Sequence, residues 1–281
     1  MKDAVQTFKD LMGWIFLVGF ILSFVAPAWG QIDCGAAITS DVTLNRDLEC
    51  KVHGIIVGRD GVTLDLGGHT ITGPGKGPWT WPGQATASVG VRVSGRKGVV
   101  VKNGTLKGFA TPLLFEDSRE SRAEGVVAMN GNYGIYLYRS SGITLSSVHA
   151  TYNVYGIHLQ DSDGNWIVRS ASSRNGYSPG GYGMVLYRSN RNTITENSIE
   201  NNETWGIWVI NSRENIIYRN NLINNKPNAV DEPGANSWYN PTLKEGDFWS
   251  DHKGGRVYTL GGFGGSQDLF PLSEKLVFSG R

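Results

Sequence analysis

Short apolar runs alternate with polar turns along most of this chain, and the alternation has a regular period. Five runs begin with glycine and continue with alternating apolar residues: Gly90–Val93, Gly134–Leu137, Gly156–Leu159, Gly183–Leu186 and Gly206–Val209. Pro112–Phe115 fills the gap between the first two. Counted from their first residues, the six runs lie 22, 22, 22, 27 and 23 residues apart. Further copies are predicted at Gly68, before the series, and at Ala229, after it.

Polar residues keep the same register. Serine ends the glycine-led run, and asparagine or serine marks the turns around two further apolar runs in each repeat. The serines are Ser118, Ser140, Ser162, Ser189 and Ser212, and the asparagines of two turns are Asn165, Asn192 and Asn215, with Asn153, Asn175, Asn202 and Asn225. Each repeat therefore predicts three short strands separated by three polar turns.

This pattern predicts an all-β fold, a single-stranded right-handed parallel β-helix of about eight or nine coils. Three short strands fit in each coil of 22–23 residues, and neighbouring coils stack about 4.8 Å apart. Stacking places each turn asparagine or serine above its equivalents, so we expect hydrogen-bonded ladders and capped ends. A globular α/β fold is excluded because no segment of the mature chain has a helical period of helix length.

The ends of the chain differ from the repeats. Lys2 and Lys9 flank the start of an apolar run, Leu11–Val25, and Ala28-Trp29-Gly30 supplies small residues for cleavage, which predicts a signal peptide over residues 1–30. An uncleaved membrane anchor is the alternative, because the run nearly reaches spanning length. The predicted divisions after it are an N-terminal cap with first coils (31–67), the repeats (68–228), and a C-terminal cap and tail (229–281).

The only two cysteines are Cys34 and Cys50. In an exported chain they most simply form one disulfide, which would hold the N-terminal cap together. A metal site that combines cysteine with histidine is the alternative. The C-terminal stretch after Asn225 is rich in Trp, Pro and Gly, and Trp238, Phe248 and Trp249 are predicted to close the open end of the core. A sugar-binding platform is the other interpretation of these aromatic residues.

The outward positions of the glycine-led strands carry the candidate chemistry, since alternate residues of a strand face opposite sides. The first outward column is Arg92, Leu114, Tyr136, His158, Val185 and Trp208; the second is Ser94, Glu116, Tyr138, Gln160, Tyr187 and Ile210. At the strand ends runs a third column, Asp117, Arg139, Asp161, Arg188 and Asn211. We expect an exposed aromatic face around His158 for sugar binding, or simple stacking between coils. The alternating charges predict a salt-bridge ladder or an acid–base strip.

Two enzymatic mechanisms fit this face. In β-elimination from a uronate, Arg139 or Arg188 would neutralise the carboxylate while Tyr138 or His158 abstracts the proton. In hydrolysis, Asp161 would pair with Asp117 or Glu116 two coils away, roughly 9–10 Å apart. The candidate catalytic residues are thus Tyr138, Arg139, His158, Asp161 and Arg188, and the candidate substrate-binding residues are Glu116, Tyr136, Gln160, Tyr187 and Trp208. Whether the protein is an enzyme stays open; if so, a polysaccharide lyase or glycoside hydrolase is expected.

Metal and nucleic-acid partners find little support in the sequence. The stretch Asp161–Asn165 matches the start of a calcium loop, but Ser172 stands where that loop needs Glu, so a turn is favoured and weak calcium binding is the alternative. No column places His or Met on adjacent coils, which argues against copper. The net charge of +1 argues against a nucleic-acid partner.

The whole mature chain resembles the NosD-like right-handed parallel β-helix proteins. The stretches that carry the resemblance are CGAAITSDVTLNRDLEC, GVTLDLGGHTITGPG, VVVKNGTLKGF and the repeats, with GDFWSDH and DLFPL near the C-terminus. The resemblance implies a periplasmic accessory protein in the maturation of the copper centre of nitrous oxide reductase. The repeats also resemble sugar-binding and sugar-hydrolase β-helices, including pectate lyases and alginate epimerases. The epimerase Asp-Pro-His-Glu motif and the pectate-lyase calcium cluster are missing, so no functional residue is carried over.

The leading prediction is an exported protein, periplasmic or extracellular, that binds and cleaves or modifies an acidic polysaccharide or oligosaccharide on the glycine-led sheet. One alternative is a NosD-like periplasmic accessory role in copper-enzyme maturation. Another is a non-catalytic structural or adhesive solenoid. No membrane partner is expected once the signal peptide is removed.

Overall fold

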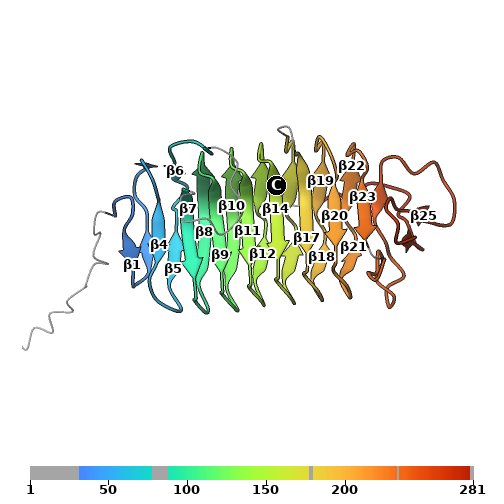
Figure 1. Ribbon diagram of the computed structural model, residues 1–281, viewed down its shortest axis with the longest axis horizontal. Helices are drawn as coiled ribbons and strands as arrows, with labels where there is room; N and C mark the ends of the chain where they lie inside the picture. Colours follow the sequence, from blue (N-terminus) through green and yellow to red (C-terminus); the bar gives the residue numbers. More distant parts are fainter. Residues whose placement is uncertain (1–31, 78–87, 177–179, 233, 279–281) are drawn as a thin grey trace, which may run out of the picture. The chain divides into compact units, whose positions relative to one another are not determined.

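A computed structural model describes residues 32–77, 88–176, 180–232 and 234–278, which belong to one compact unit, Ile32–Arg281. The predicted signal peptide over residues 1–30 lies outside the described residues. Within the described part, the chain is all-β and winds into a parallel β-helix of about eight coils (Figure 1). No helix among the described residues is long and apolar enough to cross a membrane. The predicted fold class is confirmed.

One face of the coils is a sheet of nine parallel strands in the described structure. In order along the stack these strands are β1 (Ala37–Ile38), β4 (Ile55–Val57), β7 (Val89–Ser94), β9 (Thr111–Glu116), β11 (Tyr133–Tyr138), β14 (Tyr155–Gln160), β17 (Tyr182–Tyr187), β20 (Ile207–Ile210) and β23 (Ala229–Glu232). Equivalent residues lie opposite one another, as Ile135, Ile157 and Met184 do. We call the side that points away from the core the outward face of the nine-stranded sheet.

The remaining strands of the coils form a second, larger sheet. Its first strands are β2 (Val42–Thr43), β3 (Leu48–Glu49), β5 (Thr63–Asp65), β6 (Thr70–Thr72), β8 (Val100–Lys107) and β10 (Arg122–Met129). Two rows of shorter strands follow, first β12 (Thr144–Ser146), β15 (Trp166–Val168), β18 (Thr193–Thr195) and β21 (Ile216–Tyr218), then β13 (His149–Thr151), β16 (Ala171–Ser173), β19 (Ser198–Glu200), β22 (Asn221–Ile223) and β24 (Phe248–Trp249). An antiparallel pair, β25 (Tyr258–Thr259) and β26 (Gln267–Asp268), lies near the C-terminus.

The predicted copy at Gly68 is wrong. The strand before β7 in the nine-stranded sheet is β4, with Ile55 opposite Val91, so Gly54 takes the position opposite Gly90. Gly68 lies instead in the turn between β5 and β6, with φ +81°. The longer connection between β6 and β7 breaks the 22-residue period at this point. The copy at Ala229 does continue the sheet as β23, with Ala229 opposite Ile207.

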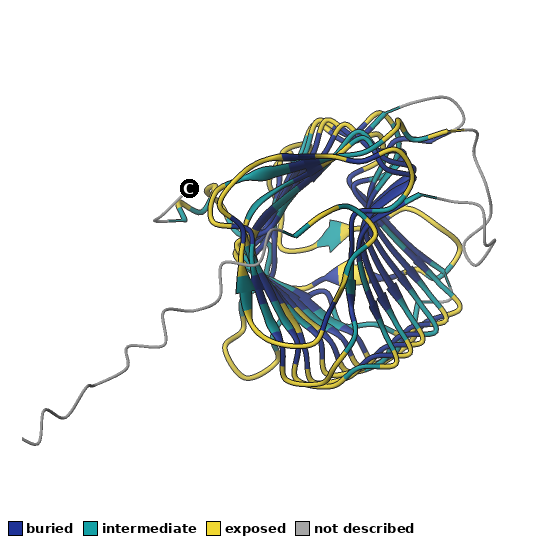
Figure 2. Ribbon diagram, turned by 90° about the vertical axis from the view of Figure 1, so that its left-hand side faces the viewer, coloured by how far each residue is buried: buried dark blue, intermediate teal, exposed yellow. Residues whose placement is uncertain are grey.

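Inward-facing aliphatic side chains of all coils form one continuous core, and Figure 2 shows buried positions recurring along the stacked strands. Leu113, Ile135 and Ile157 are among its fully buried members. Glycine is the second residue of β7, β11, β14 and β17 because the neighbouring coil leaves no space for a side chain there. A Cβ atom at Gly156 would lie 2.6 Å from the carbonyl oxygen of Gly183.

The predicted asparagine and serine ladders are confirmed. The side chain of Asn175 donates to Asn202 at 2.9 Å, and Asn202 donates to Asn225 at 2.8 Å. Each carboxamide oxygen also accepts the backbone N–H of the preceding rung, as Asn202 does from Asn175 at 3.1 Å. Serine hydroxyls act likewise in another turn, where Ser189 accepts from the backbone of Ser162 at 3.0 Å. The ladders satisfy backbone groups that the tight turns would otherwise bury unpaired.

Three asparagine ladders end at an aspartate. Because every rung donates toward the C-terminus, the last carboxamide of each ladder needs an acceptor. Asp251, Asp231 and Asp247 supply it, accepting from Asn228 at 2.7 Å, from Asn236 at 2.8 Å and from Asn220 at 2.9 Å, respectively. The aspartates therefore complete the polar ladders at this end of the coil stack.

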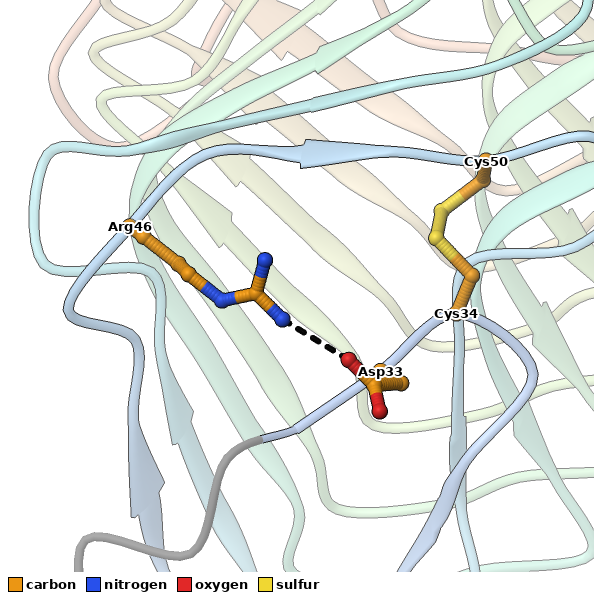
Figure 3. The surroundings of a disulfide bond; sticks show 4 residues. All are labelled: Asp33, Cys34, Arg46 and Cys50. Carbon is orange, nitrogen blue, oxygen red and sulfur yellow. Dashed lines mark hydrogen bonds and ion pairs between the residues drawn. A yellow bond between two sulfur atoms is a disulfide. The ribbon is translucent and has the colours of Figure 1, made fainter.

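Both ends of the core are closed by aromatic or covalent contacts. The predicted disulfide is confirmed: Cys34 and Cys50 are bonded, with Cα atoms 5.5 Å apart, beside an ion pair between Arg46 and Asp33 at 2.7 Å (Figure 3). At the other end Trp238 and Trp249 are buried with ring centroids 5.8 Å apart, whereas Phe248 is partly exposed. The division into caps and repeats at residues 31–67, 68–228 and 229–281 stays a prediction.

Candidate functional site

The outward face of the nine-stranded sheet brings the predicted site residues together in columns. Tyr136 lies opposite His158, His158 opposite Val185, and Val185 opposite Trp208. In the next column Glu116, Tyr138, Gln160 and Tyr187 lie on successive coils. The predicted columns are therefore present in the predicted order.

The exposure of this face differs from the expectation. Tyr136 is 3% exposed and His158 is 8% exposed, so neither lines an open surface. Outside the main core, Tyr136 belongs to a second apolar cluster with Tyr133 and Leu114, and Tyr155 packs against this cluster. The accessible part of the face lies instead at partly exposed residues, which include Tyr138, Tyr155, Tyr182, Tyr187 and Trp208.

A further aromatic column, missed in the sequence analysis, covers these residues. It consists of Tyr133, Tyr155, Tyr182 and Trp205, each directly before the glycine of its coil. The Tyr133 and Tyr155 rings stack with centroids 5.0 Å apart, and Tyr155 stacks on Tyr182 at 4.8 Å. The available signal was an aromatic residue before glycine in four successive repeats. We call this column, together with Tyr136, Tyr138 and Trp208, the aromatic row.

The aromatic row is continuous across the coils. At one end Tyr138 stacks on Tyr136 at 5.8 Å, and Tyr136 on Tyr133 at 5.1 Å. At the other end Tyr182 stacks on Trp208 at 5.5 Å, and Trp208 contacts Trp205 edge-on at 4.1 Å. Ring contacts therefore link β11, β14, β17 and β20.

His158 lies within the aromatic row. Its ring makes edge contacts with Tyr133, Tyr136 and Tyr155, with centroids 5.2–5.3 Å away. Neither ring nitrogen has a hydrogen-bond partner among the described residues. Burial lowers the pKa of His158 to about 3, because the charged imidazolium would lose its hydration without a compensating partner. At neutral pH the imidazole is uncharged.

The predicted acid–base strip forms two separate ion pairs. Arg139 binds Asp117 of the preceding coil through Nε and Nη2, both at 2.6 Å from a carboxylate oxygen. Arg188 binds Asp161 in the same way, at 2.7 and 2.8 Å. The hydrogen bonds from Arg139 lower the pKa of Asp117, so this carboxyl group stays ionised. Among the described residues no ion pair joins Arg139 to Asp161, so the ladder is interrupted between the pairs.

Both guanidinium groups also contact tyrosine rings. The Arg139 Cζ atom lies 4.1 Å from the ring centroid of Tyr138, and the Arg188 Cζ atom lies 4.7 Å from that of Tyr187. Such cation–π contacts hold the rings and charges in one layer. The hydroxyl of Tyr136 donates to Gln160 at 3.0 Å, and burial raises the pKa of Tyr136. Glu116 accepts from Ser94 at 3.2 Å.

The donor groups of the described residues do not suit a copper centre. Copper sites in proteins use clustered His, Cys or Met side chains. In the described ranges no three His, Cys, Asp or Glu side chains gather closely enough to hold a metal ion. Both cysteines are disulfide-bonded, and Met184 is buried in the core. His158 offers a single imidazole among tyrosine rings.

Comparisons with solved structures show the fold class of the protein. The A-module of the mannuronan C-5 epimerase AlgE6 from Azotobacter vinelandii is similar, with a TM-score of 0.54, 15% identity, and coverage of 75% of this chain and 61% of that chain. The periplasmic alginate epimerase AlgG gives 0.46, with 16% identity over 69% of this chain and 48% of its own. The Dettilon tailspike protein (gp208) gives 0.43, with 15% identity over 74% and 48%. This chain spans less than two thirds of each of them, and the likeness to the AlgE6 module is one of fold: a parallel β-helix.

The family follows from the sequence. Residues 87–254, more than half of the chain, match the family described as periplasmic copper-binding protein (NosD). The chain belongs to the NosD family. No curated protein matches it in sequence. The periplasmic description of the family agrees with the exported protein that the sequence predicts.

Proposed function

We propose that this NosD-family protein binds an acidic polysaccharide along the outward face of the nine-stranded sheet, between β11 and β20. The observation that carries the proposal is the aromatic row, flanked on one side by the guanidinium groups of Arg139 and Arg188. An aromatic strip that crosses four coils of an exported solenoid favours ligand binding over simple coil stacking.

The ring faces suit the apolar sides of sugar rings, and the polar edges suit hydroxyl groups. A sugar chain running along the stack would meet partly exposed rings of Tyr155, Tyr182 and Trp208 on successive coils. The indole N–H of Trp208 is buried without an acceptor, so a small ring movement on binding would give it one.

The charged pairs favour acidic sugars. Arg188 uses Nε and Nη2 on Asp161 and makes no hydrogen bond through Nη1 within the described residues. A guanidinium has five N–H donors, so Arg188 can bind a second carboxylate while it keeps the first. Ligand binding therefore needs no separation of the Asp161–Arg188 pair.

Binding is better supported than turnover. Abstraction of a proton by His158 would require access to a ring that is buried under three tyrosines. The hydrogen bonds from Arg139 hold Asp117 as an ionised carboxylate, which lacks the proton that a general acid must supply. The catalytic roles of Tyr138, Arg139, His158, Asp161 and Arg188 stay predictions, as do the substrate contacts of Glu116, Tyr136, Gln160, Tyr187 and Trp208.

A role in copper-enzyme maturation is the second candidate, and the family description favours it. Such a role does not require this chain to hold copper, since an accessory protein can act through another surface. Calorimetric titration of the mature protein separates the candidates, with polygalacturonate, a neutral glucan and Cu²⁺ as three separate ligands. Saturable binding of polygalacturonate alone supports the polysaccharide proposal. Binding of Cu²⁺ alone supports the accessory role, and silence toward all three overturns the polysaccharide proposal.

A further inference from the structure

A second polar recess lies on the larger sheet, over the outward side of β13, β16 and β19. It is a groove of about 450 Å³, and its lining includes Ser147, His149, Arg169, Ser173, Arg174 and Glu200. None of these residues belongs to the aromatic row or to the acid–base strip. A recess of this volume is in the range of small-molecule sites.

The groove exists because the outward positions at its floor are small. Ala171 and Ser173 of β16 face outward at the floor of the groove. These side chains are small and buried. On the preceding coil the larger side chain of His149 lies opposite Ala171. On the next coil Glu200 lies opposite Ser173 and lines the other side of the groove. Taller groups therefore stand at both ends of a shallow floor.

Two arginines border the groove at opposite ends of one strand. Arg169 precedes β16 and Arg174 follows it, so their Cα atoms are at most about 16 Å apart along the chain. Both are exposed, and neither forms an ion pair with any described residue. They differ in this respect from Arg139 and Arg188. Two guanidinium groups without counter-ions beside a recess favour an anionic ligand.

The negative charge of the groove is partly compensated. Glu200 lies at the edge near the C-terminal tail, where the Lys275 ammonium is 3.9 Å from its carboxylate. His149 contacts the hydroxyl of Ser173 at 3.1 Å. The remaining surface offers hydroxyl and amide groups, including Asn201, which suit a hydroxylated ligand.

We propose that this groove binds a small molecule with two carboxylates, one at each end, held by Arg169 and Arg174. Arg169 and Arg174 line the groove from the two ends of β16, and this placement favours two singly charged groups over a phosphate dianion, whose donors converge on one point. An acidic disaccharide and a free aliphatic dicarboxylate share this chemistry. The proposal does not rest on the aromatic row, and it gives the protein a second ligand site on another face.

Calorimetry with digalacturonate, glutarate and the neutral disaccharide cellobiose tests the site. Arg169→Gln and Arg174→Gln each remove one guanidinium, and we expect each to weaken digalacturonate or glutarate binding about tenfold or more. Arg213→Gln is the matched control, because Arg213 is exposed, forms no ion pair with the described residues and lies in the turn between β20 and β21. Unchanged far-ultraviolet circular dichroism and melting temperature show that each variant is folded.

The outcomes separate the sources of the ligand and the two sites. Arginine-dependent binding of digalacturonate supports an acidic sugar, and the same dependence for glutarate alone supports a free dicarboxylate. Binding of digalacturonate or glutarate that survives in the Trp208→Ala/Arg169→Gln/Arg174→Gln triple variant, equal binding of cellobiose, or no binding of any probe overturns the proposal. Trp208→Ala is expected to leave binding in the groove unchanged. Loss of polysaccharide binding at the aromatic row therefore does not imply loss of binding in the groove.

Discussion

The imidazole of His158 lies edge-on to the phenol ring of Tyr133 on the neighbouring coil, with centroids 5.3 Å apart and ring planes at 86°. Tyr136 and Tyr155 also make edge contacts with the imidazole ring. Within the described part of the chain, this arrangement gives the imidazole ring contacts and no hydrogen-bond partner. A group of this kind is tolerated only while it is neutral.

The stability of the protein should therefore decrease in acid through His158. The pKa of this group falls from 6.5 to about 3 on folding, so the unfolded chain binds the extra proton between these values. The contribution of neutral His158 to the free energy of unfolding is fully present above pH 6.5. Below pH 6.5 this contribution should fall by about 1.4 kcal/mol per pH unit. Urea unfolding of the wild type and of His158→Phe from pH 7 to pH 4 measures this slope. Equal slopes in the two proteins would show that His158 does not contribute.

Asp247 should act in the opposite direction. It is buried, one of its oxygens lacks a partner, and burial together with Asp268 raises its pKa well above 3.8. As the pH rises, the unfolded chain loses the Asp247 proton while the folded protein keeps it. The contribution of Asp247 to the free energy of unfolding is therefore fully present below about pH 4 and decreases at higher pH. Asp247→Asn keeps the acceptor for Asn220 and removes the titration. We expect a higher melting temperature than wild type at pH 7 and a smaller difference at pH 4; a lower melting temperature at pH 7 contradicts this account.

The asparagine ladder should contribute several hydrogen bonds per rung. Asn202→Ala would leave the buried backbone N–H of Asn175 without its acceptor and would remove the hydrogen bonds of the Asn202 carboxamide to Ser172 and Asn225. Each buried unpaired group costs about 1–3 kcal/mol, so a loss of about 2–5 kcal/mol in the free energy of unfolding is expected. Asn211→Gly is the control, because Asn211 is exposed and its φ of 48° suits glycine. Denaturant titration should show little change for the control, and similar losses in both variants would argue against the ladder.

The disulfide should stabilise the N-terminal end of the coil stack. Cys34 and Cys50 are 16 residues apart, and closure of a loop of this length is worth about 3 kcal/mol. The Cys34→Ser/Cys50→Ser double variant should unfold at lower denaturant concentration than the oxidised wild type. Reduced wild type should match the variant, and a wild type insensitive to reduction would contradict this role.

Much of this fold could be predicted because stacking makes the sequence periodic. The 22-residue step places Asn153 and Asn175 in one turn, and both proved to be rungs of one ladder. The prediction failed at Gly68, where a longer connection interrupts the period before β7. Periodicity also could not reveal that ladders end on Asp231 and Asp247, since each is a single event at the end of the stack.

The candidate site was predictable in its columns but not in its burial. Alternation along a strand shows that Tyr136 and His158 leave the main core, yet it does not show what covers them. Tyr133 and Tyr155 lie one residue before the glycines, at a position where the chain enters the strand, and they pack back over the outward face. The groove beside Arg169 and Arg174 depends on which outward residues are small, and alternation along a strand does not show this.

The aromatic row is the central claim, and Trp208→Ala tests it most directly. Trp166→Ala is the matched control, because Trp166 is 54% exposed on the larger sheet, away from the row. The measurement is the dissociation constant for polygalacturonate by calorimetry, at low salt, for wild type and both variants. The account predicts binding by wild type and Trp166→Ala and a loss of about tenfold or more in Trp208→Ala. Equal affinity of Trp208→Ala and wild type, or a loss confined to Trp166→Ala, would contradict it.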